Sequence, residues 1–169
     1  MNKVKIFRIT LYSIFLVLSL VMFTCFSFDF VSGFESSTGF ESIDFSRDLA
    51  TTILSISLII TLISIIGLLV TNIISILIEC EVIKRGEKTT FVINRLNIIF
   101  TTILLCVSFI VLICLKSKVS TLNRNYSLNH SVGVGGILLF VLSIVTFTCA
   151  LLANFEDKLA FLKQKKDEN

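Results

Sequence analysis

Few side chains in this sequence have the types and spacing that catalysis or metal binding requires. The chain has one histidine, His130, and five cysteines without a C-x-x-C pair (Cys25, Cys80, Cys106, Cys114 and Cys149). One imidazole cannot complete a metal site with cysteines this far apart. There is also no Ser/His/Asp set, nucleotide-binding loop or pair of carboxylates within an apolar stretch. We therefore expect no enzyme, no cofactor and no metal, and interpret the cysteines as small apolar side chains and His130 as a solvated loop residue.

A more regular pattern is formed by small, hydroxyl and amide side chains at helical spacing in three apolar stretches. They are, in chain order, Ser57, Thr61, Ser64, Gly67, Thr71 and Ser75, then Asn97, Thr101 and Ser108, and finally Gly136, Ser143 and Ala150. At 100° per residue the first set lies within an arc of about 120° on one helix face. In hydrocarbon, helices associate through close approach and interhelical hydrogen bonds, which these residue types favour. We predict that they pack helices together; the alternative is a water-filled pore lined by the hydroxyl groups.

The elements that carry these residues are long enough to cross a membrane. The 169 residues are 54% hydrophobic and 16% charged, with a mean hydropathy of +0.94. Crossing a bilayer core of roughly 30 Å takes about 20 helical residues. Four apolar blocks meet this length, at about residues 9–28, 50–78, 98–115 and 132–154. Since hydrocarbon cannot satisfy backbone polar groups, we predict an all-α membrane protein, a single four-span domain built as a four-transmembrane-helix bundle.

The distribution of basic residues predicts the orientation of the spans. Eleven of the fifteen Lys and Arg residues lie in the N-terminal tail, the loop 79–97 and the tail 155–169, and four lie in the loops 29–49 and 116–131. The positive-inside rule places the richer side, with the N-terminus and the C-terminus, in the cytoplasm. We interpret the first span as a retained anchor rather than a cleaved signal peptide. The expected location is the plasma membrane or cell membrane, with the lipid bilayer as the first partner.

The two loops on the opposite side differ in character. The segment "FDFVSGFESSTGFESIDFSRD" (28–48) is rich in Phe and acids and contains GFES twice. We interpret it as a collar whose Phe rings dip into the membrane interface while its carboxylates face water; the alternative is a loop that binds a ligand or partner. The rings concerned are Phe26, Phe28, Phe30, Phe34, Phe40 and Phe45. The loop 116–131 holds sequons at Asn125 and Asn129, and Asn125 is the candidate glycosylation site.

Two further local patterns lead to structural expectations. "SVGVGGILLF" (131–140) opens the fourth span with Gly133, Gly135 and Gly136, and predicts a close helix crossing near the outer surface. At the other side of the membrane, we expect the second helix to continue through "ECEVIKRGEK" (79–88). A Glu81–Arg85 pair at i, i+4 would support this extension, and Gly86 would stop it.

The overall plan resembles tetraspan proteins such as claudins and MARVEL-domain proteins, with four spans, cytoplasmic termini and a longer first outer loop. Four-span immunity proteins against pore-forming bacteriocins share it. The resemblance covers topology only. The claudin outer-loop signature requires tryptophans and a cysteine pair, and this chain has no Trp. The pore and strand-forming roles of claudins are therefore not expected here.

These observations favour a non-catalytic multi-pass protein that acts by lateral helix association, as a tetraspan-like scaffold or accessory subunit. The chain has no proline and no charged residue deep in a span, whereas transporters often need broken helices and buried ionisable groups. The expected partner is a second copy or another membrane protein, with no nucleic acid and no small-molecule substrate identified. The alternatives are a small channel or transport component that oligomerises around the hydroxyl stripe of the second span, and a membrane-embedded immunity or inhibitor protein.

Overall fold

A computed structural model describes residues 3–33, 36–43, 49–82, 87–126 and 129–167, with side chains over 5–33, 36–43, 49–82, 92–124 and 129–152. Four long helices dominate: α1 (Lys3–Cys25), α2 (Leu49–Glu79), α3 (Glu87–Tyr126) and α4 (Val134–Asp167). Each contains a stretch long and apolar enough to cross a membrane. The chain is therefore a multi-pass integral membrane protein with an all-α bundle at its centre.

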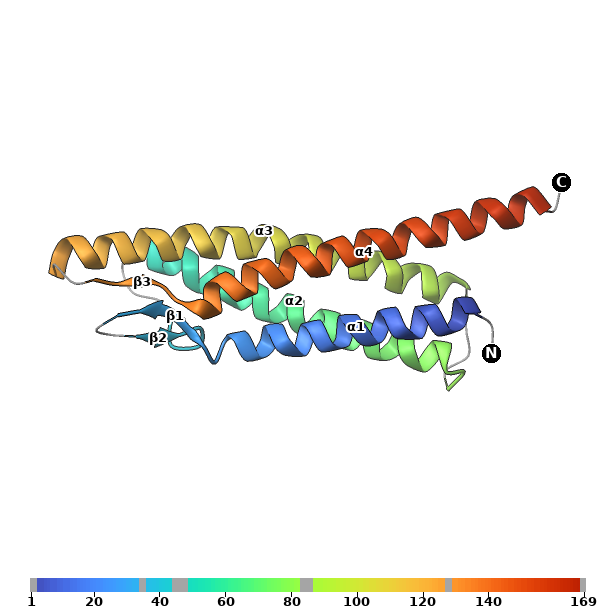
Figure 1. Cartoon of the computed structure of the whole chain (residues 1–169), viewed down its shortest axis with the longest axis horizontal. Coiled ribbons are helices and arrows are strands. Elements are labelled where there is room, and N and C mark those ends of the chain that lie inside the picture. Colours follow the sequence, from blue (N-terminus) through green and yellow to red (C-terminus); the bar gives the residue numbers. More distant parts are fainter. Residues whose placement is uncertain (1–2, 34–35, 44–48, 83–86, 127–128, 168–169) are drawn as a thin grey trace.

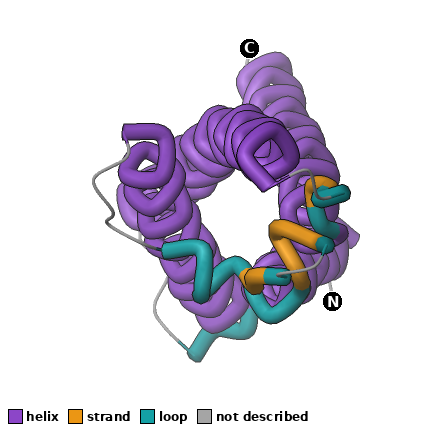
Figure 2. Tube along the Cα trace, turned by 90° about the vertical axis from the view of Figure 1, so that its left-hand side faces the viewer, coloured by secondary structure: helices purple, strands orange, loops and turns teal. Residues whose placement is uncertain are grey.

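The helices run alternately up and down, and each packs on its neighbour in the chain (Figure 1). A contact between α1 and α4 closes the set, so that the four helices surround a common axis (Figure 2). The start of α1 and the end of α4 lie at the same end of the bundle, where α4 extends past its neighbours (Figure 1). We call this the terminal end and the opposite one the cap end.

The helices extend beyond the predicted spans. Residues 87–97 and 116–126, expected in loops, belong to α3, which continues past both ends of the apolar block. Extending an existing helix requires no new nucleation, so a charged flank can stay helical outside the hydrocarbon. Conversely, α1 ends at Cys25 rather than near residue 28, where three successive i→i+3 hydrogen bonds, from the N–H groups of residues 26–28, tighten the chain into a turn.

The predicted continuation of α2 to Gly86 is wrong. The helix ends at Glu79, and Glu81 adopts the left-handed conformation with φ of 63°. The N–H of Glu81 donates to the carbonyl of Ile78, and the N–H of Val82 to that of Leu77, both at 3.0 Å. This is the Schellman arrangement that usually has glycine at the left-handed position.

At the cap end the two connections fold together into a small antiparallel sheet of order β2-β1-β3. Its strands are β1 (Asp29–Ser32), β2 (Ser37–Thr38) and β3 (Ser131–Val132). Val31 is paired with Ser37 on one side and Val132 on the other, with an irregularity in the β1–β2 register after Asp29. We call the segment 26–43 together with 129–133 the cap.

For Phe26 and Phe30, the cap corrects the prediction of a collar at the membrane interface. The rings of Phe26 and Phe30 are fully buried, in one cluster with Met22, Leu58 and Leu139 of the helices. Phe28 and Phe40 are exposed, and Phe34 and Phe45 lie outside the described residues. Hydrophobic burial at the end of the bundle therefore takes up two of the rings that sequence reasoning assigned to the interface.

The glycines of the fourth span fit against this sheet. A Cβ on Gly133 would lie 2.0 Å from the carbonyl oxygen of Asp29, and one on Gly135 would lie 2.7 Å from the ring of Phe30. Gly136 instead faces Leu115 of α3, where a Cβ would lie 2.6 Å from Cδ1. The predicted close approach is present: Gly136 meets α3, Gly135 meets both the ring of Phe30 and the Cys25 carbonyl oxygen at the end of α1, and Gly133 admits strand β1.

Candidate functional site

The hydroxyl stripe of α2 points into the bundle. Ser57, Thr61, Ser64, Thr71 and Ser75 are all buried, and Gly67 lies against the ring of Phe100 on α3. Three of these hydroxyls, those of Thr61, Ser64 and Ser75, donate to a carbonyl one turn earlier in their own helix, as Thr61 does to Ser57 at 2.8 Å. Such bonds satisfy the hydroxyl groups inside hydrocarbon without a partner helix. The stripe is therefore enclosed within one copy of the chain.

A polar network links α2 to α3 in the half of the bundle nearer the terminal end. The hydroxyl of Thr71 donates to Oδ1 of Asn97 at 2.5 Å, and Nδ2 of Asn97 donates to Oδ1 of Asn72 at 3.4 Å. Asn72 is fully buried and also donates to the carbonyl of Leu68 at 2.7 Å. Of the expected α3 residues, Asn97 thus bonds across helices, whereas the buried Thr101 donates only to its own helix.

The small residues of α4 meet two different helices. Ser143 lies 2.7 Å from Ser108 of α3, oxygen to oxygen, and both side chains are buried. Gly136 also faces α3, as described above, whereas Ala150 packs with Tyr12 and Phe15 of α1. The small-residue positions therefore serve contacts within this chain on both sides of α4.

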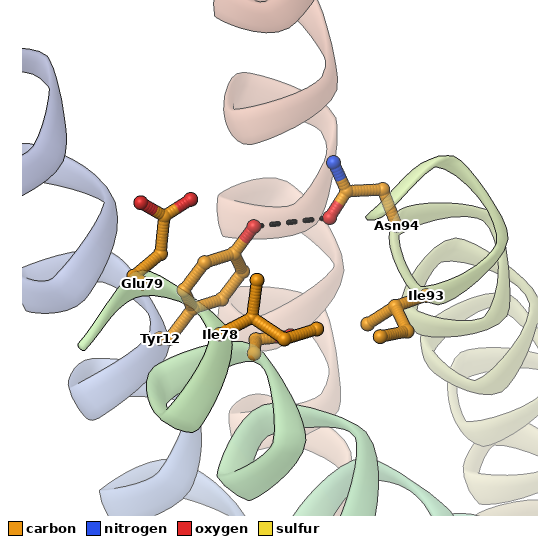
Figure 3. A pocket seen from close by; sticks show the side chains of 6 residues that line it. Tyr12, Ile78, Glu79, Ile93 and Asn94 are labelled. Atoms are coloured by element: carbon orange, nitrogen blue, oxygen red, sulfur yellow. Dashed lines mark hydrogen bonds between the residues drawn. The ribbon is translucent and has the colours of Figure 1, made fainter. Parts of the chain in front are cut away.

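At the terminal end, polar side chains from three helices surround a small cavity. Figure 3 shows Tyr12 reaching across from α1, and its hydroxyl donates to Oδ1 of Asn94 on α3 at 3.0 Å. Glu79, at the last residue of α2, is only 5% exposed and has Nη1 of Arg8 at 3.5 Å. The cavity measures about 10 Å³ and is lined by Tyr12, Ser75, Ile78, Glu79, Ile93 and Asn94. That volume is close to the minimum for one water molecule, so no larger substrate fits.

Ion pairing at this end continues into water. Lys5 of α1 contacts the left-handed Glu81 at 2.5 Å, and this bond and the lysine's charge lower the pKa of that carboxyl. The sequence indicated the hydroxyl stripe but not the partners Tyr12, Arg8 and Lys5. Their i, i+3 and i+7 spacing on one face of the first helix was the signal available.

His130 is not solvated as predicted. It is 7% exposed, and its backbone N–H and C=O are held by the side-chain amide of Asn123 at 2.6 and 2.9 Å. Its Nδ1 is buried and has no hydrogen-bond partner among the residues that the structure describes. Pairing of β3 with β1 brings His130, the residue before β3, against Gly33, which its ring contacts.

The remaining candidates are scattered. Asn125 belongs to the last turn of α3, and its side chain lies outside the described residues, so its glycosylation stays a prediction. The five cysteines are free; Cys25 is buried, whereas Cys80 and Cys106 are exposed. Within the described part of the chain, no three His, Cys, Asp or Glu side chains are grouped as metal ligands would be.

Comparison of the chain with protein-family models, with curated proteins and with solved structures finds no match. The residues and their contacts are therefore the basis for assigning a function.

Proposed function

We propose that this membrane protein is non-catalytic and acts by lateral association, as a tetraspan-like scaffold or accessory subunit with both termini in the cytoplasm. The supporting observation is that the polar seams are already used within one chain. Thr71, Asn72 and Asn97 join α2 to α3, and Ser108 and Ser143 join α3 to α4. A bundle completed in this way needs no partner to satisfy these side chains. Any partner would meet its aliphatic outer surface or its cap.

The outward face of α2 is the surface best suited to another helix. Its exposed large side chains are all β-branched over about 30 Å of helix, at spacings of three and four residues. These are Ile53, Ile56, Ile60, Ile63, Ile66, Val70 and Ile73, which we call the β-branched ridge. Isoleucine and valine have one strongly preferred χ1 rotamer in a helix, so they lose little side-chain freedom when a second helix packs against them. The exposed faces of the other helices mix in Leu, Phe or Thr.

Oxidative cross-linking in membranes tests this assignment. In a variant with the native cysteines replaced by alanine, Ile63→Cys places a thiol on the ridge, where the native side chain is 59% exposed. Val141→Cys on α4, 47% exposed in the native chain, is the matched control on another lipid-facing surface. We expect a cross-linked product from Ile63→Cys only, at twice the mass for a second copy or at another mass for a different membrane protein. Equal cross-linking of both variants, or of neither, would contradict the role of the ridge.

The proposed orientation has its own test. Glu35→Cys and Lys163→Cys, each in the cysteine-free background, should be labelled by an impermeant maleimide from opposite faces of the membrane. Labelling of both from the same face would overturn the four-span arrangement with cytoplasmic termini.

The two alternative functions gain no support from the described contacts. A channel formed by several copies around the α2 stripe would need each copy to turn buried hydroxyls such as those of Ser64 and Thr71 outward. Reconstitution in vesicles gives the direct check: we expect no conductance. An ion current that Ser64→Ala or Thr71→Val alters would favour the channel. For an immunity or inhibitor role, a pore-forming protein co-purifying in mild detergent would be the decisive finding.

A further inference from the structure

The turn that follows β2 holds one aromatic ring against the rim of the bundle. Phe40 is 44% exposed, yet its ring packs on two others. It meets Phe23 of α1 edge-on, with centroids 6.1 Å apart and planes at 69°, and the buried Phe26 at 5.4 Å. Among the described residues, the ring therefore has one side packed on the protein and the other side exposed.

The contact with Phe23 identifies what that free side faces. Phe23 is 41% exposed and lies in the membrane-spanning part of α1, two residues before the helix ends. Leu20 and Val21, also exposed, precede it on the lipid-facing side of the same helix. An exposed apolar side chain in a span contacts acyl chains, and Phe40 continues this surface at its edge.

The turn fixes the position of Phe40 through hydrogen bonds on both sides of it. The N–H of Thr38 donates to the Glu41 carboxylate at 2.9 Å, while the N–H of Glu41 donates to the Thr38 hydroxyl at 3.3 Å. The N–H of Gly39 donates to the carbonyl of Phe26 at 3.0 Å. These bonds turn the Glu41 carboxylate back onto the cap, and those with Thr38 lower its pKa, so that it stays charged beside the ring. A ring fixed in advance loses little conformational entropy when its surroundings order around it.

We propose that Phe40 and Phe23 form an aromatic rim that inserts into the bilayer leaflet at the cap end, at the boundary between headgroups and acyl chains. The partner is the lipid, because the ring is continuous with the lipid-facing surface of α1. Gly39, the residue before Phe40, is buried and so offers no surface to a protein partner. A single ring is also far smaller than the surface that a stable protein partner needs. The rim thus ties the cap, whose remaining described rings are buried except for Phe28, to the membrane surface.

Because the chain has no tryptophan, a single Phe40→Trp substitution gives an unambiguous fluorescent reporter. The full-length protein is reconstituted in phosphatidylcholine vesicles brominated near the headgroup or deep in the acyl chain. Ile63→Trp, at an exposed site in the middle of α2, is the deep standard. Ser120→Trp, exposed on α3 between Lys118 and Arg124, is the aqueous standard.

We expect Phe40→Trp to be quenched several-fold more by shallow bromines than by deep ones. Ile63→Trp should show the reverse order, and Ser120→Trp should be quenched by neither. Phe40→Trp behaving like Ser120→Trp would overturn the proposal. So would quenching that appears only when the protein is diluted in lipid, since a second copy would then cover the ring. Persistent resistance of the buried Cys25 to maleimide shows that each variant remains folded at the cap.

Discussion

Gly133→Ala should open the cap, because the new methyl group would meet backbone rather than a movable side chain. Its Cβ would lie 2.0 Å from the Asp29 carbonyl oxygen and 2.5 Å from the carbonyl carbon, whereas real Cβ contacts rarely fall below 3.0 Å. Strand β1 would have to move away. That movement breaks the bond from the Gly133 N–H to the carbonyl of Phe30, now 2.8 Å long. Overpacking costs about 1–3 kcal/mol and the lost hydrogen bond about 1 kcal/mol, so we expect a destabilisation of about 2–4 kcal/mol.

Gly136→Ala is the matched control, three residues further along the chain, in the first turn of α4. Its Cβ would come too close only to a side chain, Cδ1 at the flexible end of Leu115 at 2.6 Å, and would lie at an ordinary 3.7 Å from Cγ1 of Val132. Alanine also gains up to about 1 kcal/mol of helix propensity over glycine, which offsets the repacking. We expect the net change for this variant to stay within about 1 kcal/mol.

The rate of maleimide labelling at Cys25 measures the difference. This thiol is buried at the base of the cap. The backbone carbonyl of Cys25 lies against Gly135, where an added Cβ would be 2.8 Å away, so we expect the thiol to react only when the cap opens. With the other four cysteines replaced, labelling at equilibrium should accelerate roughly 30- to 1000-fold in Gly133→Ala, at 1.4 kcal/mol per factor of ten. Gly136→Ala should change it by less than about tenfold. Equal rates in the two variants would refute the assignment of the Gly133 contact.

Three further outcomes are expected. Asn97→Leu should destabilise the bundle by about 1–2 kcal/mol in detergent unfolding, because Oδ1 of Asn72 loses its donor; adding Asn72→Leu should cost less than the sum of the single changes. His130→Phe should stabilise the cap by about 1 kcal/mol, seen as slower thiol labelling, because it removes a buried nitrogen without a described partner. Lys5→Met should raise the pKa of Glu81 toward its ordinary value, as followed by NMR of the carboxyl carbon. Since the folded pKa is lowered, the pair stabilises the protein at neutral pH, and its contribution disappears as the pH falls through that pKa. An unchanged Glu81 titration would contradict the contact.

The four helices and the inward hydroxyl arc could be predicted from the sequence because each depends on local pattern. Apolar length alone specifies a membrane helix, and the 100° advance per residue places Thr61 and Ser64 on the same side as Thr71. Which neighbour each face meets was not readable. The Asn97–Thr71 contact, for instance, requires knowing that α2 and α3 pack together at that height.

The cap could not be predicted because its cause is non-local. Strands of two to four residues carry no periodic signal, and β1 is ordered by β3 from the far end of the chain. The same pairing buries His130, whose surroundings in sequence are polar. Glu81 likewise takes the left-handed position after α2, where sequence patterns predict a glycine such as Gly86. Its contact with Lys5 again depends on a distant part of the chain, the first helix. Local propensity yields to tertiary context at both places.

The pairing of β1 with β3 also bears on the order in which the protein is assembled. Phe30 is synthesised early, whereas Gly133, against which strand β1 packs, follows about a hundred residues later. Contacts between residues so far apart in sequence form slowly. A ribosome-bound chain with only three helices inserted would therefore leave the ring of Phe30 without the contacts that α4 supplies, a surface on which quality-control factors can act. Arrival of the fourth helix brings Gly133 and Gly135 against strand β1 and the ring of Phe30, so closure at that end of the bundle coincides with insertion of this helix.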